Sequence, residues 1–195
     1  MEMSLLRHRL NRFGYRPWSF RYSSTRLNLA EIAARLNAFV EKVPTQTIHF
    51  VGHSLGGVVV LKLFEAFPSQ RPGRIVVLSP PYQDSQTARR FIRFPGGRNL
   101  LGPCITQLLK GDVPAWSGKR DLGVIGGTLN FGLGRLIGAV GPSGDGTVCI
   151  EEMCIPGVRD FITLHVSHMG LLVSKEVASE ICHFLEHGVF SRVSF

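Results

Sequence analysis

The residues with the clearest chemical potential surround Ser54. The pentapeptide Gly52-His53-Ser54-Leu55-Gly56 places a glycine two positions before and two positions after a serine. An apolar run typical of a strand precedes it, and one typical of a helix follows it. A serine at such a junction takes a strained backbone conformation that exposes its hydroxyl. We therefore identify Ser54 as a candidate nucleophile, and we expect larger residues at 52 or 56 to obstruct the turn.

A serine hydroxyl is a weak nucleophile at neutral pH, so Ser54 needs a base and an acid beside it. A neutral imidazole can take the hydroxyl proton and return it to a leaving group, while a carboxylate fixes the imidazole tautomer. In parallel sheets, reactive residues lie just after the carboxyl ends of strands, here in the chain order serine, acid, histidine. The partners of Ser54 are therefore expected in loops after later strands.

The acid that fits this order is Asp145. It lies in the glycine-rich segment 141–148, after a predicted strand at 122–125. The alternative interpretation is an Asp-Gly pair that only shapes a turn. The other carboxylates considered precede or begin strands: Asp112, Asp121 and Asp160.

The base that fits is His168, in a loop after the last predicted strand, 161–165. His165 is its alternative, but it lies within that strand, whereas His168 lies beyond its end and can reach the turn at Ser54. Three other histidines are weaker candidates, because one is adjacent to the nucleophile and points elsewhere, and two lie on the final helix: His53, His183 and His187.

Alternating apolar periodicities predict the elements that position these residues. Residues spaced at three and four favour helices, and alternation favours strands. Strands that alternate with helices indicate an α/β fold with a parallel sheet. The predicted helices are 5–13, 28–43, 55–67 and 174–187, and the predicted strands are 18–22, 48–51, 74–78, 122–125 and 161–165.

Length and composition predict one domain, 1–195, because 195 residues with 44% apolar content can bury a full core. The net charge of +8 is spread along the chain without a basic, aromatic-interleaved motif, so no nucleic-acid partner is expected.

Four cysteines without metal-ligand spacing predict neither a metal site nor a redox motif. The N-terminus lacks the apolar run of a secretory signal, and the glycine-rich stretch 123–141 does not fit a membrane span, so a cytoplasmic location is expected.

Taken together, these motifs resemble the lipase-like serine esterases of the α/β-hydrolase superfamily. The resemblance rests on 52–57, on the loop 145–148 and on His168-Met169-Gly170 before the closing helix, and it spans nearly the whole chain. It implies a three-layer fold with a parallel sheet and hydrolysis of carboxylic esters through an acyl-enzyme, without a metal or organic cofactor. The catalytic residues it implies are Ser54, Asp145 and His168, with the Leu55 N–H as one donor of the oxyanion hole.

The sequence departs from this family at its start. Members carry an additional strand, ending in a His-Gly loop that supplies the second oxyanion donor, before the helix predicted at 5–13. No residue here can be assigned that role, so the fold is expected to be N-terminally truncated. Either the natural coding sequence starts further upstream or the chain is a shortened relative. We favour the first, because the apolar spacing from Met3 to Leu10 is intact.

The segment 80–121 is where this superfamily inserts a lid. Apolar residues there alternate with arginines and could form an acyl-binding cover that approaches anionic membrane surfaces, while an ordinary crossover helix is an equal alternative. A lipid ester is one predicted substrate, and short-chain esters, thioesters and acyl transfer stay open. The residues concerned are Arg89, Arg90, Phe91, Ile92, Arg93, Phe94, Arg98, Leu100, Leu101, Ile105, Leu108 and Leu109.

A different class also fits the sequence: a non-catalytic, hydrolase-like binding or scaffold protein. The missing oxyanion strand favours it, whereas the retention of Ser54, Asp145 and His168 favours an enzyme. Covalent labelling of Ser54 by a fluorophosphonate distinguishes the two. The sequence predicts no oligomeric state.

Overall fold

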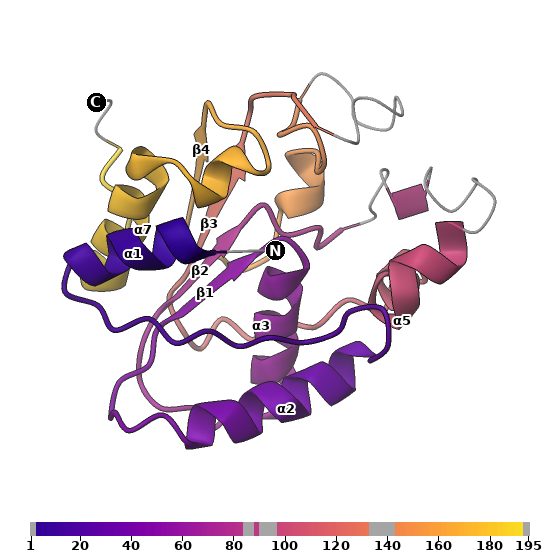
Figure 1. Ribbon diagram of the computed structural model, residues 1–195, viewed down its shortest axis with the longest axis horizontal. Coiled ribbons are helices and arrows are strands. Elements are labelled where there is room, and N and C mark those ends of the chain that lie inside the picture. The colour runs from indigo at the N-terminus through magenta and orange to yellow at the C-terminus, as the bar shows by residue number, and fades with distance from the viewer. Residues whose placement is uncertain (1–2, 84–87, 90–96, 133–142, 193–195) are drawn as a thin grey trace.

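Four parallel strands form the central sheet of the computed structural model, as the α/β prediction requires (Figure 1). The structure describes residues 3–83, 88–89, 97–132 and 143–192, with only the backbone for 97–101. The strands are β1 (Phe50–His53), β2 (Ile75–Leu78), β3 (Leu122–Gly127) and β4 (Asp160–Leu164); the helices are α1 (Ser4–Arg12), α2 (Leu29–Glu41), α3 (Leu55–Ala66), α5 (Gly97–Leu109) and α7 (Lys175–His187), with short 3-10 turns η1 (Glu151–Met153) and η2 (Gly170–Leu172).

The strands pair in chain order, β1-β2-β3-β4, and every pair is parallel. Val51 lies opposite Val76, and Val76 opposite Gly123. Because all four strands point the same way, the residues that follow them meet at one edge of the sheet. Ser54, Ser79 and the loops after β3 and β4 therefore share that edge.

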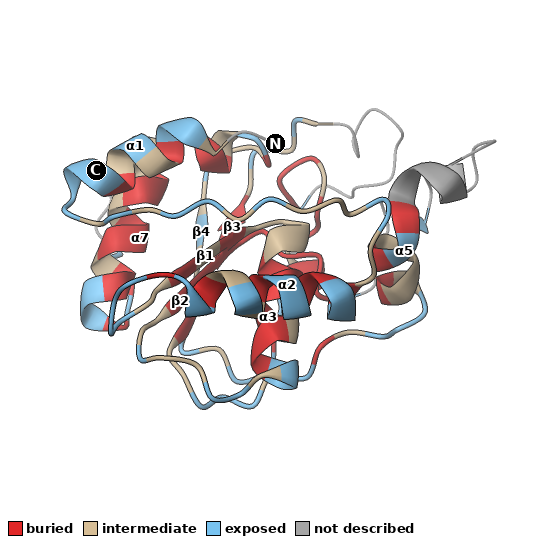
Figure 2. Ribbon diagram, turned by 60° about the horizontal axis from the view of Figure 1, so that its bottom comes forward, coloured by how far each residue is buried: buried red, intermediate tan, exposed pale blue. Residues whose placement is uncertain are grey.

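Helices cover both faces of the sheet, which produces three layers (Figure 2). Along β2, Ile75 and Val77 pack with α2 and α3, while Val76 and Leu78 pack with α1 and α7. All four side chains are fully buried. β2 is thus apolar on both faces, as expected for a parallel strand inside a sheet.

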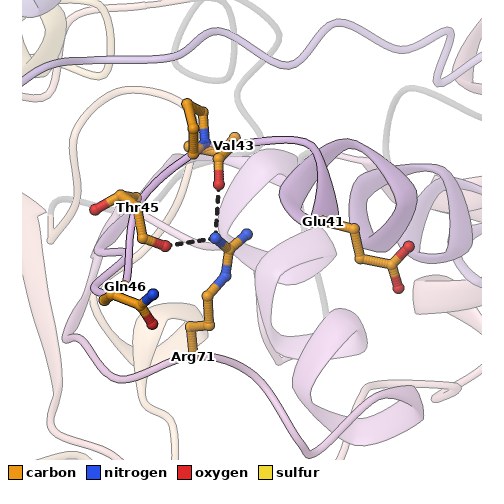
Figure 3. A pocket seen from close by; sticks show the side chains of 6 residues that line it. Glu41, Val43, Thr45, Gln46 and Arg71 are labelled. Carbon is orange, nitrogen blue, oxygen red and sulfur yellow. Dashed lines mark hydrogen bonds between the residues drawn. The ribbon is translucent and has the colours of Figure 1, made fainter.

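Polar contacts define both ends of α2, the helix that precedes β1. At its start, the Asn28 side chain accepts from the Glu31 N–H and the Glu31 carboxylate accepts from the Asn28 N–H, a capping box. At its end, the Arg71 guanidinium donates to the carbonyls of Val43 and Thr45 (Figure 3). A cation at these carbonyls complements the negative end of the helix dipole.

The strand predicted at 18–22 is wrong. These residues are extended, but within the described part of the chain no strand pairs with them, and a cavity of about 1030 Å³ separates them from β1. β1 is consequently an edge strand. Alternation alone suggested a strand because Phe20 and Tyr22 do turn toward the core, where Phe20 packs on Phe39.

The other predicted elements are confirmed, with shifts of at most two residues at their ends. β1 begins two residues later than predicted, at Phe50. The difference arises because Ile48 already donates to Pro72 outside the ladder, so the apolar run extends beyond the paired residues. β4 ends at Leu164, which leaves His165 outside the strand in which it was predicted.

Only part of the predicted lid segment 80–121 is described. α5 falls within it, and its residues Cys104 and Leu108 are buried against the main core. Ile105 packs against the same core, as an ordinary crossover helix requires. Other residues of the predicted cover lie outside the residues, or the side chains, that the structure describes: Arg90, Phe91, Ile92, Arg93, Phe94, Arg98, Leu100 and Leu101.

The turn between β1 and α3 leaves no room for a side chain at Gly52. A Cβ there would lie 2.7 Å from the Gly57 backbone and from the Gly56 carbonyl oxygen. Gly56 is different, because the nearest atom to its Cβ position is the Tyr22 hydroxyl oxygen at 3.7 Å, an ordinary contact. The steric requirement predicted for both glycines therefore holds at Gly52 and not at Gly56.

We expect Gly52→Ala to lower the free energy of unfolding by about 2 kcal/mol or more, since backbone must move to admit the methyl group. Gly56→Ala is the matched control, and its unfolding free energy should lie within about 0.5 kcal/mol of the wild type. Urea unfolding followed by circular dichroism measures both. Equal stability of the two variants would contradict this account of the turn.

Candidate active site

Ser54 lies at the sharp turn between β1 and α3, at the carboxyl edge of the sheet. Its backbone has φ 53° and ψ −128°, a conformation that is unusual for a residue other than glycine. The strain is held on both sides, because the Ser54 N–H donates to the Leu78 carbonyl at 2.8 Å and its carbonyl accepts from the Gly57 N–H at 2.9 Å. Strained residues of this kind cluster at functional sites, so the backbone of Ser54 agrees with its choice as the candidate nucleophile.

Asp145 is fully buried, and its carboxylate is satisfied on both oxygens. Oδ1 accepts from the N–H groups of Thr147 at 2.9 Å and Val148 at 2.8 Å. Oδ2 lies 2.6 Å from Nδ1 of His168. Burial by itself would raise the pKa of Asp145, but hydrogen bonds from His168, the Val148 N–H and Ser79 outweigh it and lower the pKa below its ordinary value. The carboxylate is therefore charged at neutral pH.

The loop that carries Asp145 lies directly over the end of β3. A Cβ at Gly127 would be 2.7 Å from the Asp145 Cβ and 2.4 Å from the Val166 carbonyl oxygen. Below it, the Ser79 hydroxyl accepts from the Gly127 N–H at 3.3 Å. β3 thus ends in a glycine because the acid loop and the loop after β4 both pass over it at close range.

His168 is buried in the loop after β4 and is fixed through its backbone as well as its ring. Its N–H donates to the Asp145 carbonyl at 2.9 Å. Since the charged carboxylate only accepts, Nδ1 of His168 carries the proton that bridges to Oδ2, which leaves Nε2 available as the base of the neutral ring. This is the tautomer that a general base for a serine requires.

His53, which sequence reasoning set aside, packs directly against the candidate base. The two imidazole rings lie 4.5 Å apart between centroids. Nε2 of His53 is 3.0 Å from the His168 carbonyl oxygen, so Nε2 donates to it. Burial, followed by the nearby His168, lowers the pKa of His53 to about 4. The only sequence signal for this neighbour was its position at the end of β1, the edge where the loop after β4 also ends.

The other carboxylates and histidines weighed as acid or base make contacts away from the pair of Asp145 and His168. Asp121 pairs with Arg74, and Asp160 accepts from the Phe190 N–H. Asp112 accepts from the Gln107 side chain. The competing histidines make other contacts: His165 with Thr128, His183 with the Val189 carbonyl, and His187 with the His183 carbonyl.

The structure thus brings Asp145 and His168 into contact and sets His168 beside the strand that ends at Ser54. Within the described part of the chain, no hydrogen bond joins the Ser54 hydroxyl to the His168 ring. Catalytic hydrogen bonds are often longer without substrate. Leu55 is the first residue of α3, so its N–H has no partner within the helix, and Leu55 lines the same cavity as Ser54.

Among the residues that the structure describes, no group of three His, Cys, Asp or Glu side chains could hold a metal ion. The described helices are also too short or too polar to cross a membrane.

Comparison with solved structures finds the same fold at low sequence identity. The mature lipase BlEst2 of Bacillus licheniformis superposes with a TM-score of 0.64 at 15% identity, covering 83% of this chain and 74% of the lipase. The metagenomic carboxyl esterase MGS0156 gives a TM-score of 0.66 at 20% identity, covering 94% and 69%. A pyrethroid hydrolase of Sphingobium faniae JZ-2 gives 0.64 at 13% identity, covering 95% and 92%.

Sequence comparison identifies the family. Curated protein sequences contain no match to this chain. The model of the alpha/beta hydrolase family, however, matches residues 3–142, which include α1, the turn at Ser54 and the strands through β3. The matched region is well over half of the chain and ends just before the loop of Asp145. With the parallel sheet and the turn geometry, this match shows that the protein belongs to the alpha/beta hydrolase family.

Proposed function

We propose that this chain is a serine hydrolase that cleaves carboxylic esters through a covalent acyl-enzyme. The observation that carries the proposal is the buried 2.6 Å contact between Asp145 Oδ2 and His168 Nδ1, at the same sheet edge as the strained turn of Ser54. A purely structural ion pair would not need to lie at the edge of the sheet where the fold also holds a serine in an unfavourable conformation. The three residues occur in the chain order that this fold uses.

In the proposed reaction, Nε2 of His168 takes the Ser54 hydroxyl proton as Oγ attacks the ester carbonyl carbon. The carbonyl π electrons move onto oxygen, and the Leu55 N–H stabilises the resulting oxyanion. The oxyanion then collapses, the bond to the alcohol oxygen breaks, and His168 returns its proton to that oxygen. Water repeats the sequence on the acyl-enzyme and releases the acid. Asp145 stays ionised and holds the imidazolium in position.

The cavity beside Ser54 supports an apolar acyl group. Its volume is about 1030 Å³, and it extends from Ser54 along β1 to the region of Thr45. Aromatic side chains from the extended segment and from α2 line it: Trp18, Phe20, Tyr22 and Phe39. Neighbouring structures bear the names of a lipase and a carboxyl esterase, which agrees with an ester substrate.

The first test is covalent labelling and turnover. We expect a fluorophosphonate probe to label the wild type and not Ser54→Ala. Hydrolysis of a p-nitrophenyl ester should fall by at least about a thousand-fold in both Ser54→Ala and His168→Ala. Asp145→Asn should lower kcat by about a thousand- to ten-thousand-fold through the wrong imidazole tautomer.

His165→Ala is the matched control for His168→Ala, because both histidines follow β4 and only His168 contacts Asp145. It should retain turnover close to the wild type. A folded wild type that neither reacts with the probe nor hydrolyses the ester would remove the enzymatic proposal and favour a binding or scaffold role. Loss of turnover in His165→Ala alone would transfer the role of base to His165.

The second test concerns the acyl group. If the acyl chain lies in the apolar cavity, each added methylene contributes about 0.8 kcal/mol, or roughly a four-fold gain in kcat/KM, until the cavity is filled. We therefore expect kcat/KM to rise from p-nitrophenyl acetate to the octanoate. A preference for acetate over the longer esters would place the acyl group outside this cavity.

His53 has a supporting role in the proposed site. Its imidazole is neutral at neutral pH because burial lowers its pKa to about 4. A neutral ring does not repel the imidazolium that forms on His168, and its bond to the His168 carbonyl fixes the base loop. His53 is thus a positioning residue with a measurable effect on stability.

The third test follows from this lowered pKa. Between pH 6.5 and about 4, the unfolded chain binds a proton at residue 53 that the folded chain does not, so stability falls as the pH is lowered. The total effect is about 3 kcal/mol, most of it lost by pH 5. In urea unfolding at pH 7 and pH 5, His53→Gln should lose about 2 kcal/mol less than the wild type. His183→Gln, on α7, should lose as much as the wild type; equal losses in all three proteins would refute the role of His53.

A further inference from the structure

Tyr22 brings a phenol hydroxyl to the start of α3, next to the turn of Ser54. Its oxygen is the nearest atom to the Cβ position of Gly56, at 3.7 Å. Side chains in a helix lean toward its N-terminus, so this point lies on the Leu55 side of Gly56. Tyr22 also lines the cavity that contains Ser54 and Leu55.

The Tyr22 hydroxyl is available as a donor. It makes no hydrogen bond to any residue that the structure describes. Burial, followed by the neighbouring Cys104, raises the pKa of Tyr22 to about 12, so the phenol keeps its proton at neutral pH. Tyr22 is partly buried and lines the cavity, so its hydroxyl can donate to a group bound there.

Packing holds both the Tyr22 ring and the turn that follows it. The Tyr22 ring stacks on Phe20 with centroids 5.8 Å apart and an interplanar angle of 25°. Beyond it, the turn after Tyr22 is fixed by α5. Gly102 has a φ of 73°, and its Cβ position is only 2.6 Å from the Ser24 carbonyl oxygen, while the Cys104 thiol donates to the Leu27 carbonyl at 3.0 Å. The hydroxyl is therefore positioned before any substrate binds.

The oxyanion in the proposed reaction can accept a hydrogen bond from a second donor of this kind. The oxyanion of a tetrahedral intermediate is commonly stabilised by two donors, and Leu55 supplies one. We propose that the Tyr22 hydroxyl is the second oxyanion donor of this site. The inference rests on the proposed function.

The step involves no proton transfer to or from Tyr22. As the bond between Ser54 Oγ and the carbonyl carbon forms, the π electron pair moves to the carbonyl oxygen, and both the Leu55 N–H and the Tyr22 O–H donate to it. When the pair returns, the bond to the leaving oxygen breaks, and that oxygen receives its proton from His168. Both donors then face a neutral carbonyl again.

The test compares Tyr22→Phe with Tyr82→Phe. Tyr82 does not line the cavity of Ser54, and its hydroxyl donates to the Pro114 carbonyl at 2.9 Å, so its variant removes the same group away from the proposed site. Loss of an oxyanion donor should lower kcat of Tyr22→Phe for a p-nitrophenyl ester by about a hundred- to a thousand-fold with little change in KM. Tyr82→Phe should keep kcat within about two-fold. A Tyr22→Phe protein with the kcat of the wild type would overturn the inference.

A second measurement separates an electrostatic role from a structural one. A trifluoromethyl ketone forms a hemiketal with a nucleophilic serine and places an oxyanion at the site. Its inhibition constant should rise in Tyr22→Phe by the same factor as kcat/KM falls, while the KM of the ester stays constant. An equal rise in the inhibition constant of the ketone and in the KM of the ester would mean a general loss of packing and would refute the donor role. If the wild type itself lacks activity and labelling, the proposed function fails and this inference with it; an active wild type with an unaffected Tyr22→Phe refutes the inference alone.

Discussion

The arrangement of the site depends on one buried charge, the carboxylate of Asp145. With no exposed surface, this group would be strongly destabilising without donors, since desolvation of a carboxylate is expensive in a low-dielectric interior. The N–H groups of Thr147 and Val148 and the ring of His168 provide those donors. Because the charge requires them, the 145–148 turn and the loop after β4 cannot move independently. The same electrostatic requirement that closes the acid loop therefore orients the imidazole.

The parallel sheet makes this pairing reachable. Asp145 and His168 come from loops after β3 and β4, yet both lie over the carboxyl edge that β1 and β2 also reach. Close approach is possible because β3 ends in Gly127, where a Cβ would collide with Asp145. From the other side, His53 at the end of β1 donates to the His168 carbonyl. Strand ends thus hold the loop of His168 from two directions, which in the proposed reaction reduces the reorganisation needed when charge develops on the imidazole.

Much of this arrangement follows from local patterns in the sequence. The closing helix, predicted over 174–187, forms with Ser174 as its N-cap and Gly188 in the left-handed conformation at its end. Patterns of this kind depend on neighbours in the chain, and they also predicted Ser54, Asp145 and His168 as the candidate residues in that chain order. The alternation at 18–22 misled because a strand needs a partner, and pairing is a non-local property. The contacts of His53 and Tyr22 are also non-local, and no spacing along the chain encodes the short distance between Tyr22 and Gly56.

Because the edge of β1 is unpaired, the cavity has one polar wall and one apolar wall. Ile48, Phe50 and Ser54 donate to the β2 side, so the alternation of a parallel ladder directs the intervening N–H groups of Val51 and His53 toward the cavity. One wall of the cavity is therefore a row of backbone donors and acceptors, and the facing wall, from Trp18 to Phe39, is aromatic. An acyl chain can lie on the aromatic wall while water or polypeptide satisfies the strand edge, because the two requirements fall on opposite sides. Tyr22 lies in the aromatic wall at the end nearest Ser54. At that end a hydroxyl can donate to the reacting carbonyl while its ring still contacts an apolar acyl chain.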